Sequence, residues 1–273
     1  MDLTLVIPCF NEASRIDACL EAVTSYLDRL RALDGAVGEV VVVDDGSRDG
    51  TAERVRAFGA RRADVRVVAL ASNAGKGAAV RAGVQAARGD IVVFLDADLA
   101  VDVSHVDQVL SPLRNGVDVA VGCRHVPGAR VEVPQGAVRR ALGRGYLQLA
   151  RWLLGIPVSD VTCGFKGFKR RAALSLFQDA QCRRWGFDAE ILHLASRRGL
   201  ELLEVPVRWR DGSGSRVKLP GDVLRSLREL VAVRWRSSTG AYRRSAESGG
   251  AVSGGTVSGG SVSGGAGSDD VRP

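Results

Sequence analysis

Acidic residues follow two apolar runs of the sequence, at the point where each run ends. Asp44 and Asp45 close a run of four valines. Asp96 and Asp98 come directly after the run Ile91–Leu95. Such runs are typical of buried parallel strands, and open α/β sheets bind their ligands at the carboxyl ends of those strands. Because carboxylates that share one crevice repel each other, this pattern indicates a site that receives a divalent cation or hydrogen-bond donors.

The pair Asp96 and Asp98 gives the most specific chemical signal. Residues i and i+2 of a chain that leaves a strand share one face, so both carboxylates can reach one Mg²⁺ or Mn²⁺. These hard cations prefer oxygen ligands and bridge to the oxygens of a diphosphate. A solvated loop is the other interpretation of this triplet. At the end of the valine run, one carboxylate can accept hydrogen bonds from a base or a ribose, and a capped turn is the alternative there.

Two further segments can contribute to the same site. The glycine-rich segment 73–77 precedes a predicted helix, so its backbone N–H groups and Lys76 can face an anion. It has neither the Lys-Ser/Thr ending of a Walker loop nor the spacing of a dinucleotide-binding loop, so alone it is a weak signal. Pro8 and Glu12 stand between the first predicted strand and the first helix. A capped turn without a ligand is the alternative for them.

Strands and helices alternate along the first half of the chain. Apolar runs predict strands at 3–8, 39–43, 65–70, 91–95 and 117–122. Helical spacing of apolar residues and capping residues predict helices at about 12–33 and 50–58, and another that ends near residue 87. This alternation predicts an α/β fold with a doubly wound, mostly parallel sheet and helices on both faces.

The second half of the chain is less regular. Helices are predicted near 136–154, 170–177, 187–198 and 222–236, with a strand at 201–209. From Ser248 the sequence repeats a Ser-Gly-Gly unit that has nothing to pack. The interpretation is one domain, residues 1–236, followed by a disordered Gly/Ser-rich tail, residues 237–273.

The net charge of +7 is unevenly distributed. Residues 208–244 carry ten Lys/Arg and three acidic residues, an excess equal to that of the whole chain of 273 residues. Such a segment attracts phosphates or an anionic membrane surface, or is simply a solvated basic face. Nucleic acid is not expected as a partner, because aromatic residues make up only 5% of the chain and no nucleic-acid-binding motif is present.

Cysteine use and hydropathy indicate a location. Five scattered cysteines without a Cys-x-x-Cys or Cys/His cluster predict reduced thiols and no zinc site. No signal peptide precedes the first strand, and no apolar run reaches the ~18 residues that a membrane span needs. Two basic amphipathic stretches, 138–156 and 222–236, either lie in a membrane interface or cover the core. We therefore expect a cytoplasmic protein that can bind peripherally to the inner face of the cell membrane.

Seven motifs, taken in order, resemble one enzyme family. They are VIPCFNE, VVVDDGS, NAGKGAAVRAG, FLDADLA, VGCRH, DVTCGFKGF and WGFDAEIL. Together they cover about residues 3–236 and resemble the inverting GT-A glycosyltransferases of family 2, above all the dolichyl- and polyprenyl-phosphate sugar synthases. The dolichyl-phosphate β-glucosyltransferase type is the most similar. The mannosyltransferase type comes next, since Ala100 stands where that type usually has glutamine. The resemblance implies a GT-A fold.

The resemblance also implies which residues bind the donor. The residues that would line the nucleotide sugar are Pro8, Glu12, Asp44, Lys76 and Asp96. The residues that would hold Mg²⁺ or Mn²⁺ are Asp96 and Asp98, with Asp98 as the direct ligand.

Other residues acquire roles in catalysis and acceptor binding through the same resemblance. Arg124 would neutralise phosphate, and Asp188 would be the catalytic base. The segment Gly164-Phe165-Lys166 would border the donor sugar. Arg216 and Lys218 would close over the phosphate of the acceptor.

The implied reaction is a hexosyl transfer. The enzyme would move a hexose with inversion from a nucleotide-diphosphate sugar, UDP-glucose before GDP-mannose, to a polyprenyl or dolichyl phosphate. A phosphate acceptor is already anionic and scarcely needs a base, whereas a hydroxyl acceptor would need Asp188. Two alternatives stay open. One is transfer to a hydroxyl of a soluble or polymeric acceptor, and the other is a non-catalytic nucleotide-sugar-binding protein.

Overall fold

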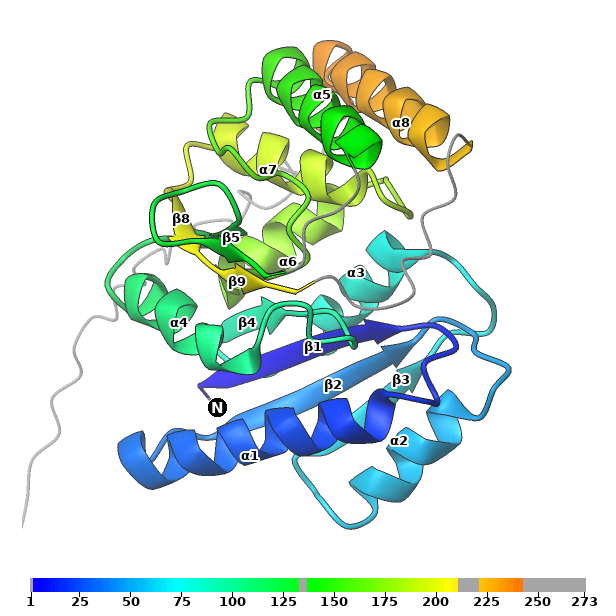
Figure 1. Ribbon diagram of the computed structural model, residues 1–273, viewed down its shortest axis with the longest axis vertical. Coiled ribbons are helices and arrows are strands. Elements are labelled where there is room, and N and C mark those ends of the chain that lie inside the picture. The colour runs from blue at the N-terminus through cyan, green and yellow to red at the C-terminus, as the bar shows by residue number, and fades with distance from the viewer. Residues whose placement is uncertain (1, 133–136, 211–220, 243–273) are drawn as a thin grey trace, which may run out of the picture.

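The computed structural model describes residues 2–132, 137–210 and 221–242. These residues include a seven-stranded sheet of order β3-β2-β1-β4-β7-β5-β8 (Figure 1). Its strands are β1 (Leu3–Cys9), β2 (Gly38–Asp44), β3 (Val65–Ala69), β4 (Ile91–Phe94), β5 (Val119–Cys123), β7 (Lys166–Lys169) and β8 (Leu202–Pro206). All neighbours are parallel except at β7, which is antiparallel to β4 and β5. The predicted mostly parallel α/β sheet is confirmed.

Helices cover both faces of this sheet, because successive residues of a strand point to opposite faces. Leu5 and Ile7 face one core, which also contains residues of α1 (Ile16–Asp34), α2 (Thr51–Gly59), the short 3₁₀ helix η1 (Val103–His105) and α4 (Val106–Arg114). Val6 faces the other core. That core contains residues of α3 (Lys76–Ala86), α5 (Ala137–Leu154), α6 (Arg170–Asp179), α7 (Phe187–Arg197) and α8 (Gly221–Ser238). Every residue of β1 and β2 is buried, which explains their continuous apolar runs.

Three parts of the chain differ from the prediction. The strand β7 was not predicted, because its sequence Lys-Gly-Phe-Lys has neither an apolar run nor clear alternation. The helix α4 was not predicted either. The single strand predicted at 201–209 is wrong in its extent. It is divided into β8 and β9 (Arg208–Trp209), and β9 pairs with β6 (Arg130–Val131) outside the main sheet.

The described chain ends beyond the predicted domain boundary. Helix α8 continues to Ser238, and Tyr242 donates a hydrogen bond to buried Glu190, with 2.6 Å between Oη and Oε1. Residues 243–273, most of the predicted tail, lie outside the described residues. Among the helices that are described, none combines the length and apolar character needed to cross a membrane. All five cysteines are buried and form no disulfide.

Candidate active site

The carboxyl ends of three central strands meet at one edge of the sheet. Cys9 at the end of β1 pairs in register with Asp44 at the end of β2, and β4 ends on the other side of β1. The loops that follow these strands are therefore neighbours. Asn11 joins two of them: its backbone N–H donates to Ser47 Oγ at 2.8 Å, and its Oδ1 accepts from the backbone N–H of Arg48 at 2.9 Å. The tertiary structure thus brings the predicted nucleotide-binding segments together.

Pro8 and Glu12 lie on either side of this junction. Pro8 is a buried residue of β1 itself. Glu12 follows in the next loop, where its backbone N–H donates to Thr51 Oγ1 at 2.9 Å and its carboxylate pairs with Arg15 at 2.9 Å. Glu12 thus joins this loop to the segment that follows β2, and a contact of Pro8 or Glu12 with a nucleotide stays a prediction.

The adjacent residues Asp44 and Asp45 accept hydrogen bonds from different segments. Asp44 accepts a hydrogen bond from the backbone N–H of Ser47 at 3.1 Å, within its own turn. Asp45 reaches across to the next loop, where Oδ1 accepts from the N–H of Ala74 at 2.7 Å and Oδ2 from the N–H of Gly75 at 2.8 Å. Asp45 therefore holds the loop that leads into α3, and a contact of Asp44 with a base or ribose stays a prediction.

Lys76, the first residue of α3, is brought to the aspartates that follow β4. Its Nζ lies 2.6 Å from Asp96 Oδ1 and 5.6 Å from the centre of the Trp185 ring. Burial alone would lower the pKa of Lys76, but the charges of Asp96, Asp188 and Asp98 and the hydrogen bond to Asp96 together raise it. The predicted donor-binding lysine and the predicted metal-binding pair thus belong to one site.

Asp98 lies two residues further on, at the solvent side of this site. Its Oδ1 accepts from the backbone N–H of Ala100 at 3.0 Å. The surrounding protein and the negative charge of Asp96 raise the pKa of the Asp98 carboxyl group. Asp96 and Asp98 therefore form a pair of like charges that a divalent cation would stabilise.

Gly164 was recognised in a motif, but the reason for a glycine there comes from the structure. A Cβ at this position would lie 2.1 Å from Asp96 Oδ2 and 3.1 Å from Lys76 Nζ. Any side chain would displace Asp96 or Lys76, so the backbone at Gly164 forms a close-fitting wall of the site. Spacing along the sequence carried no signal of this contact.

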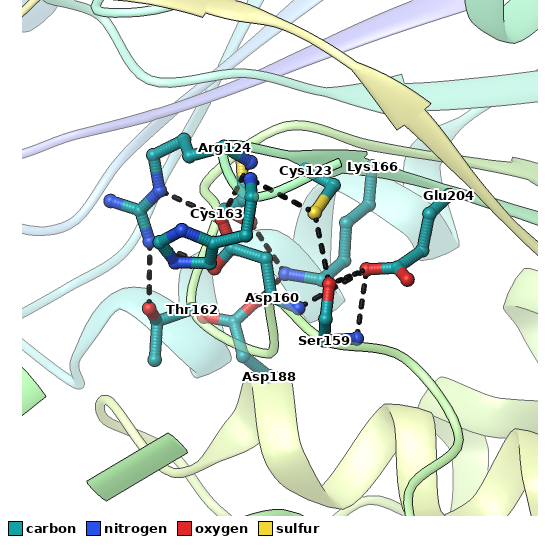
Figure 2. A network of polar contacts seen from close by, with 10 residues as sticks. Cys123, Arg124, Ser159, Asp160, Thr162, Cys163, Lys166, Asp188 and Glu204 are labelled. Atoms are coloured by element: carbon teal, nitrogen blue, oxygen red, sulfur yellow. Dashed lines mark hydrogen bonds and ion pairs between the residues drawn. The ribbon is translucent and has the colours of Figure 1, made fainter. Parts of the chain in front are cut away.

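Asp188 and Lys166 form an ion pair deeper in the protein (Figure 2). Lys166 Nζ lies 2.5 Å from Asp188 Oδ1 and 2.5 Å from the carbonyl oxygen of Cys163. Burial raises the pKa of Asp188, and the charges of Lys166 and then Lys76 oppose that effect. The predicted catalytic base is therefore a buried carboxylate with a fixed cationic partner.

Arg124 is held by a different carboxylate in the same network (Figure 2). Its Nε and Nη2 donate to the two oxygens of Asp160 at 2.7 and 2.8 Å, and Nη2 also donates to Thr162 at 2.9 Å. The guanidinium carbon lies 5.4 Å from the centre of the Trp209 ring. Asp160 is wholly buried and offsets much of the positive charge of Arg124. A role for Arg124 in neutralising a ligand's phosphate stays a prediction.

A family model described as glycosyl transferase family 2 matches residues 4–177. The chain belongs to this family.

Relatives of this glycosyltransferase share most of its length. It is 35% identical to "Dolichyl-phosphate beta-glucosyltransferase ALG5C" of Trichomonas vaginalis, over 84% of this chain and 70% of that protein. It is 32% identical to the human dolichyl-phosphate beta-glucosyltransferase, over 88% of this chain and 77% of that one. It is also 32% identical to the Saccharomyces cerevisiae protein of the same name, over 88% of this chain and 76% of that one.

Solved structures agree with the GT-A fold. Glucosyl-3-phosphoglycerate synthase from Mycobacterium tuberculosis, in complex with UDP, superposes with a TM-score of 0.62 and 25% identity, over 85% of this chain and 80% of that one. The same synthase was also crystallised with UDP and Mn²⁺ or Mg²⁺, with TM-scores of 0.61. The predicted fold class and the predicted membership of family 2 are both confirmed.

The acidic residues of this family 2 enzyme fit a metal that the substrate helps to bind. Within the described ranges, no cluster of three or more His, Cys, Asp or Glu side chains could hold a metal by itself. Asp96 and Asp98 provide two carboxylates, and Mg²⁺ is commonly bound by one or two carboxylates together with substrate phosphates and water. The donor set therefore suits Mg²⁺ or Mn²⁺ and a diphosphate bound together. The predicted acceptor residues Arg216 and Lys218 lie outside the described residues.

Proposed function

We propose that this glycosyltransferase moves a hexose from a nucleotide-diphosphate sugar to a polyprenyl or dolichyl phosphate, with inversion. UDP-glucose is the favoured donor and GDP-mannose the next. The observation that carries the proposal is the edge of the sheet where Asp44, Lys76, Asp96 and Asp98 meet. The relatives named for dolichyl-phosphate glucosyl transfer support the acceptor, and the UDP complexes of the solved neighbours support the donor.

Each residue of this edge has a task in the proposed reaction. Asp44 accepts hydrogen bonds from the base or ribose, with Pro8 and Glu12 beside it. Asp96 and Asp98 would hold Mg²⁺ or Mn²⁺, which offsets charge on the departing nucleoside diphosphate. Lys76 adds a positive charge next to the diphosphate, close to Asp96.

The proposed acceptor carries its own negative charge. A lipid phosphate attacks the anomeric carbon from the face opposite the leaving group, and the configuration is inverted. No proton has to be removed from such a nucleophile, so Asp188 serves mainly to fix charge in the wall of the site. Arg216 and Lys218 are proposed to bind the acceptor phosphate, and Arg124 is proposed to add positive charge nearby.

Helices α5 and α8 are proposed to contact the membrane that contains the acceptor. They lie side by side (Figure 1). Leu147, Ala150 and Leu154 of α5 and Leu230 and Val233 of α8 are core residues, so part of each apolar face packs inside.

The outer face of these two helices is apolar and basic. Trp152 of α5 is 80% exposed and Trp235 of α8 is 66% exposed. Exposed leucines and valines lie on the same helices, namely Leu142, Leu149, Leu224 and Val231. Exposed arginines accompany them, namely Arg144, Arg151, Arg225, Arg228 and Arg234. Tryptophan and arginine together suit the headgroup region of an anionic membrane. This supports a peripheral location on the cytoplasmic face of the cell membrane.

A second candidate is transfer to a hydroxyl group of a soluble acceptor. It is favoured by the solved neighbour that was crystallised with Mn²⁺, UDP-glucose and phosphoglyceric acid. In that reaction Asp188 would act as general base, for which a raised pKa is suited.

A donor and acceptor panel tests the proposal. UDP-glucose, UDP-galactose and GDP-mannose are each incubated with the enzyme and Mn²⁺, with and without polyprenyl phosphate. We expect a glycolipid product from UDP-glucose that appears only with the polyprenyl phosphate. Transfer to phosphoglyceric acid but not to the lipid would support the second candidate instead.

A further inference from the structure

Lys166 is an ammonium group placed completely inside the protein. Its side chain has 0% exposure. Its Nζ is surrounded by the Asp188 carboxylate, the carbonyl of Cys163 and the ring of Phe94, whose centre is 5.5 Å away. A buried charge without a partner is strongly unfavourable, so a lysine persists at such a place only with a matched carboxylate. The position therefore demands an explanation beyond ordinary core packing.

The antiparallel strand β7 explains why this charge lies at the site. β7 runs opposite to β4, so its first residue, Lys166, pairs with Phe94, the last residue of β4. Asp96 follows two residues later. A parallel strand in this place would have put its first residue at the other edge of the sheet. The insertion of β7 thus delivers a lysine to the edge at which the carboxylates gather.

Charges alternate from this lysine outward to the open side of the site. Lys166 forms an ion pair with Asp188, and Lys76 forms one with Asp96. The positive charge of Lys76 also favours the ionised form of Asp188, though less than that of Lys166 does. Each charged group thus has a group of opposite sign beside it. A displacement of the Asp188 carboxylate would change the electrostatic potential at Lys76, which pairs with Asp96.

We propose that Lys166 is a positioning residue of this transferase, which fixes the Asp188 carboxylate in the wall of the site and acts on the reaction only through it. The inference rests on the proposed function, because it assumes that Asp188 belongs to the wall of the donor site. Lys166 itself touches neither donor nor acceptor, because it has no exposed surface.

A double-mutant cycle tests this role. Lys166→Met, Asp188→Asn and the double variant are compared with the parent enzyme in kcat and in the KM for the donor. We expect Lys166→Met to lower kcat about 10- to 100-fold, the range typical of residues that orient a functional group, with little change in KM. The double variant is expected to match Asp188→Asn within about twofold, because Lys166 has nothing left to position.

Lys169→Met is the matched control. Lys169 belongs to the same strand, bonds to the carbonyl of Gly116 and pairs with Asp118 at 3.5 Å. It is expected to retain the kcat of the parent enzyme. Circular dichroism and thermal unfolding establish whether each variant is folded.

The pH profile separates positioning from a purely structural role. The charged and titratable groups around Asp188 are Lys166 from β7, Lys76 from α3, Asp96 after β4 and Tyr146 from α5. Removal of Lys166 takes away the largest influence that keeps Asp188 ionised. The acidic limb of kcat is therefore expected to move to higher pH in Lys166→Met and to stay in place in Lys169→Met.

Three results would overturn the inference. The first is a kcat of Lys166→Met equal to that of the parent enzyme. The second is a folded Lys166→Met variant in which the acidic limb of kcat has not moved. The third is a double variant that is less active than Asp188→Asn by more than about twofold. If Lys166→Met does not fold, the comparison of the double variant with Asp188→Asn decides, because neither of these two variants contains the Asp188 carboxylate. Failure of polyprenyl phosphate as acceptor contradicts the proposed function alone, because the cycle can also be measured on hydrolysis of the donor.

Discussion

The open side of the site and its inner wall each contain one lysine–aspartate pair, but the two pairs lie in different surroundings. Lys76 and Asp96 approach to 2.6 Å, and their side chains are 16% and 35% exposed. Lys166 and Asp188 approach to 2.5 Å, and their side chains are 0% and 7% exposed. Water and ligands can replace the partners of the first pair at small cost. The second pair can lose a partner only by leaving a charge buried in the protein.

This difference assigns the two pairs to different parts of the reaction. An accessible pair can exchange its partners, so Lys76 and Asp96 can turn to a diphosphate and a cation when the donor binds. A buried pair is a fixed arrangement of charge that is present before the donor arrives and needs no rearrangement during transfer. Measurements of activity and of stability should therefore separate the pairs.

Loss of the metal-binding carboxylate is expected to have the largest effect. Asp98→Asn should lower transfer about 100-fold or more, because a metal at a leaving group contributes several kcal/mol to transition-state stabilisation. EDTA should reduce the activity of the parent enzyme similarly, and added Mn²⁺ should restore it. Asp107→Asn, on the exposed surface of α4, is the control. Full activity in Asp98→Asn or in EDTA would contradict a metal site here.

The two lysines are expected to differ most in stability. Lys166→Met should lower the free energy of unfolding by about 3–5 kcal/mol, since it leaves Asp188 buried without its partner. Lys76→Met should lower it by less, because the side chains of Lys76 and Asp96 are partly exposed, while raising the KM for the donor. Urea titrations followed by circular dichroism measure both values. Equal losses in the two variants would remove the distinction between the accessible pair and the buried pair.

The Asp188 carboxylate is expected to matter differently for two nucleophiles. Asp188→Asn should lower transfer to polyprenyl phosphate by no more than about 10- to 100-fold, the loss expected for Lys166→Met, because that acceptor is already ionised and needs no general base. Hydrolysis of the donor uses water, which must lose a proton, and should fall by about 10²–10⁴. Initial rates of both reactions on one enzyme preparation give the ratio. A comparably large loss with the lipid phosphate would favour general-base catalysis and a hydroxyl acceptor.

The smallest expected effect concerns the outer helices. Replacement of Arg225, Arg228 and Arg234 by glutamine should weaken sedimentation with anionic liposomes, more at low salt than at high salt, and leave turnover of a short-chain acceptor unchanged. Arg236 is kept, because it contacts Glu190 at 3.4 Å inside the domain. Neutral liposomes are the control. Unchanged sedimentation would show that these arginines are only a solvated face.

Much of the nucleotide side could be predicted because its signals are local. The valine run that ends in Asp44 and the run that ends before Asp96 are strands buried on both faces, and such strands are apolar throughout. Alternation with helices makes them parallel, which places their carboxyl ends at one edge. The sequence therefore predicts that the two acidic segments lie together.

The inner wall could not be predicted in the same way. The central strand that carries Lys166 has only four residues, two of which are lysines, and its place is set by pairing with β4 and β5. The partner of Lys166 is 22 residues away in the sequence. The requirement for glycine at 164 arises from the nearness of Asp96, 68 positions earlier in the chain. None of these contacts leaves a periodic trace.

By itself, the sequence determined the alternation of strands and helices, the edge at which acidic residues gather and the resemblance to a glycosyltransferase family. These features depend on local hydrophobic period and on residues adjacent along the chain. Only the tertiary structure decided that Asp45, and not Asp44, accepts hydrogen bonds from the loop that leads into α3. It also decided that Arg124 is held by Asp160 and that a buried lysine stands behind Asp188. Those outcomes depend on which side chains compete for the same carboxylate in space, and spacing along a chain does not record that competition.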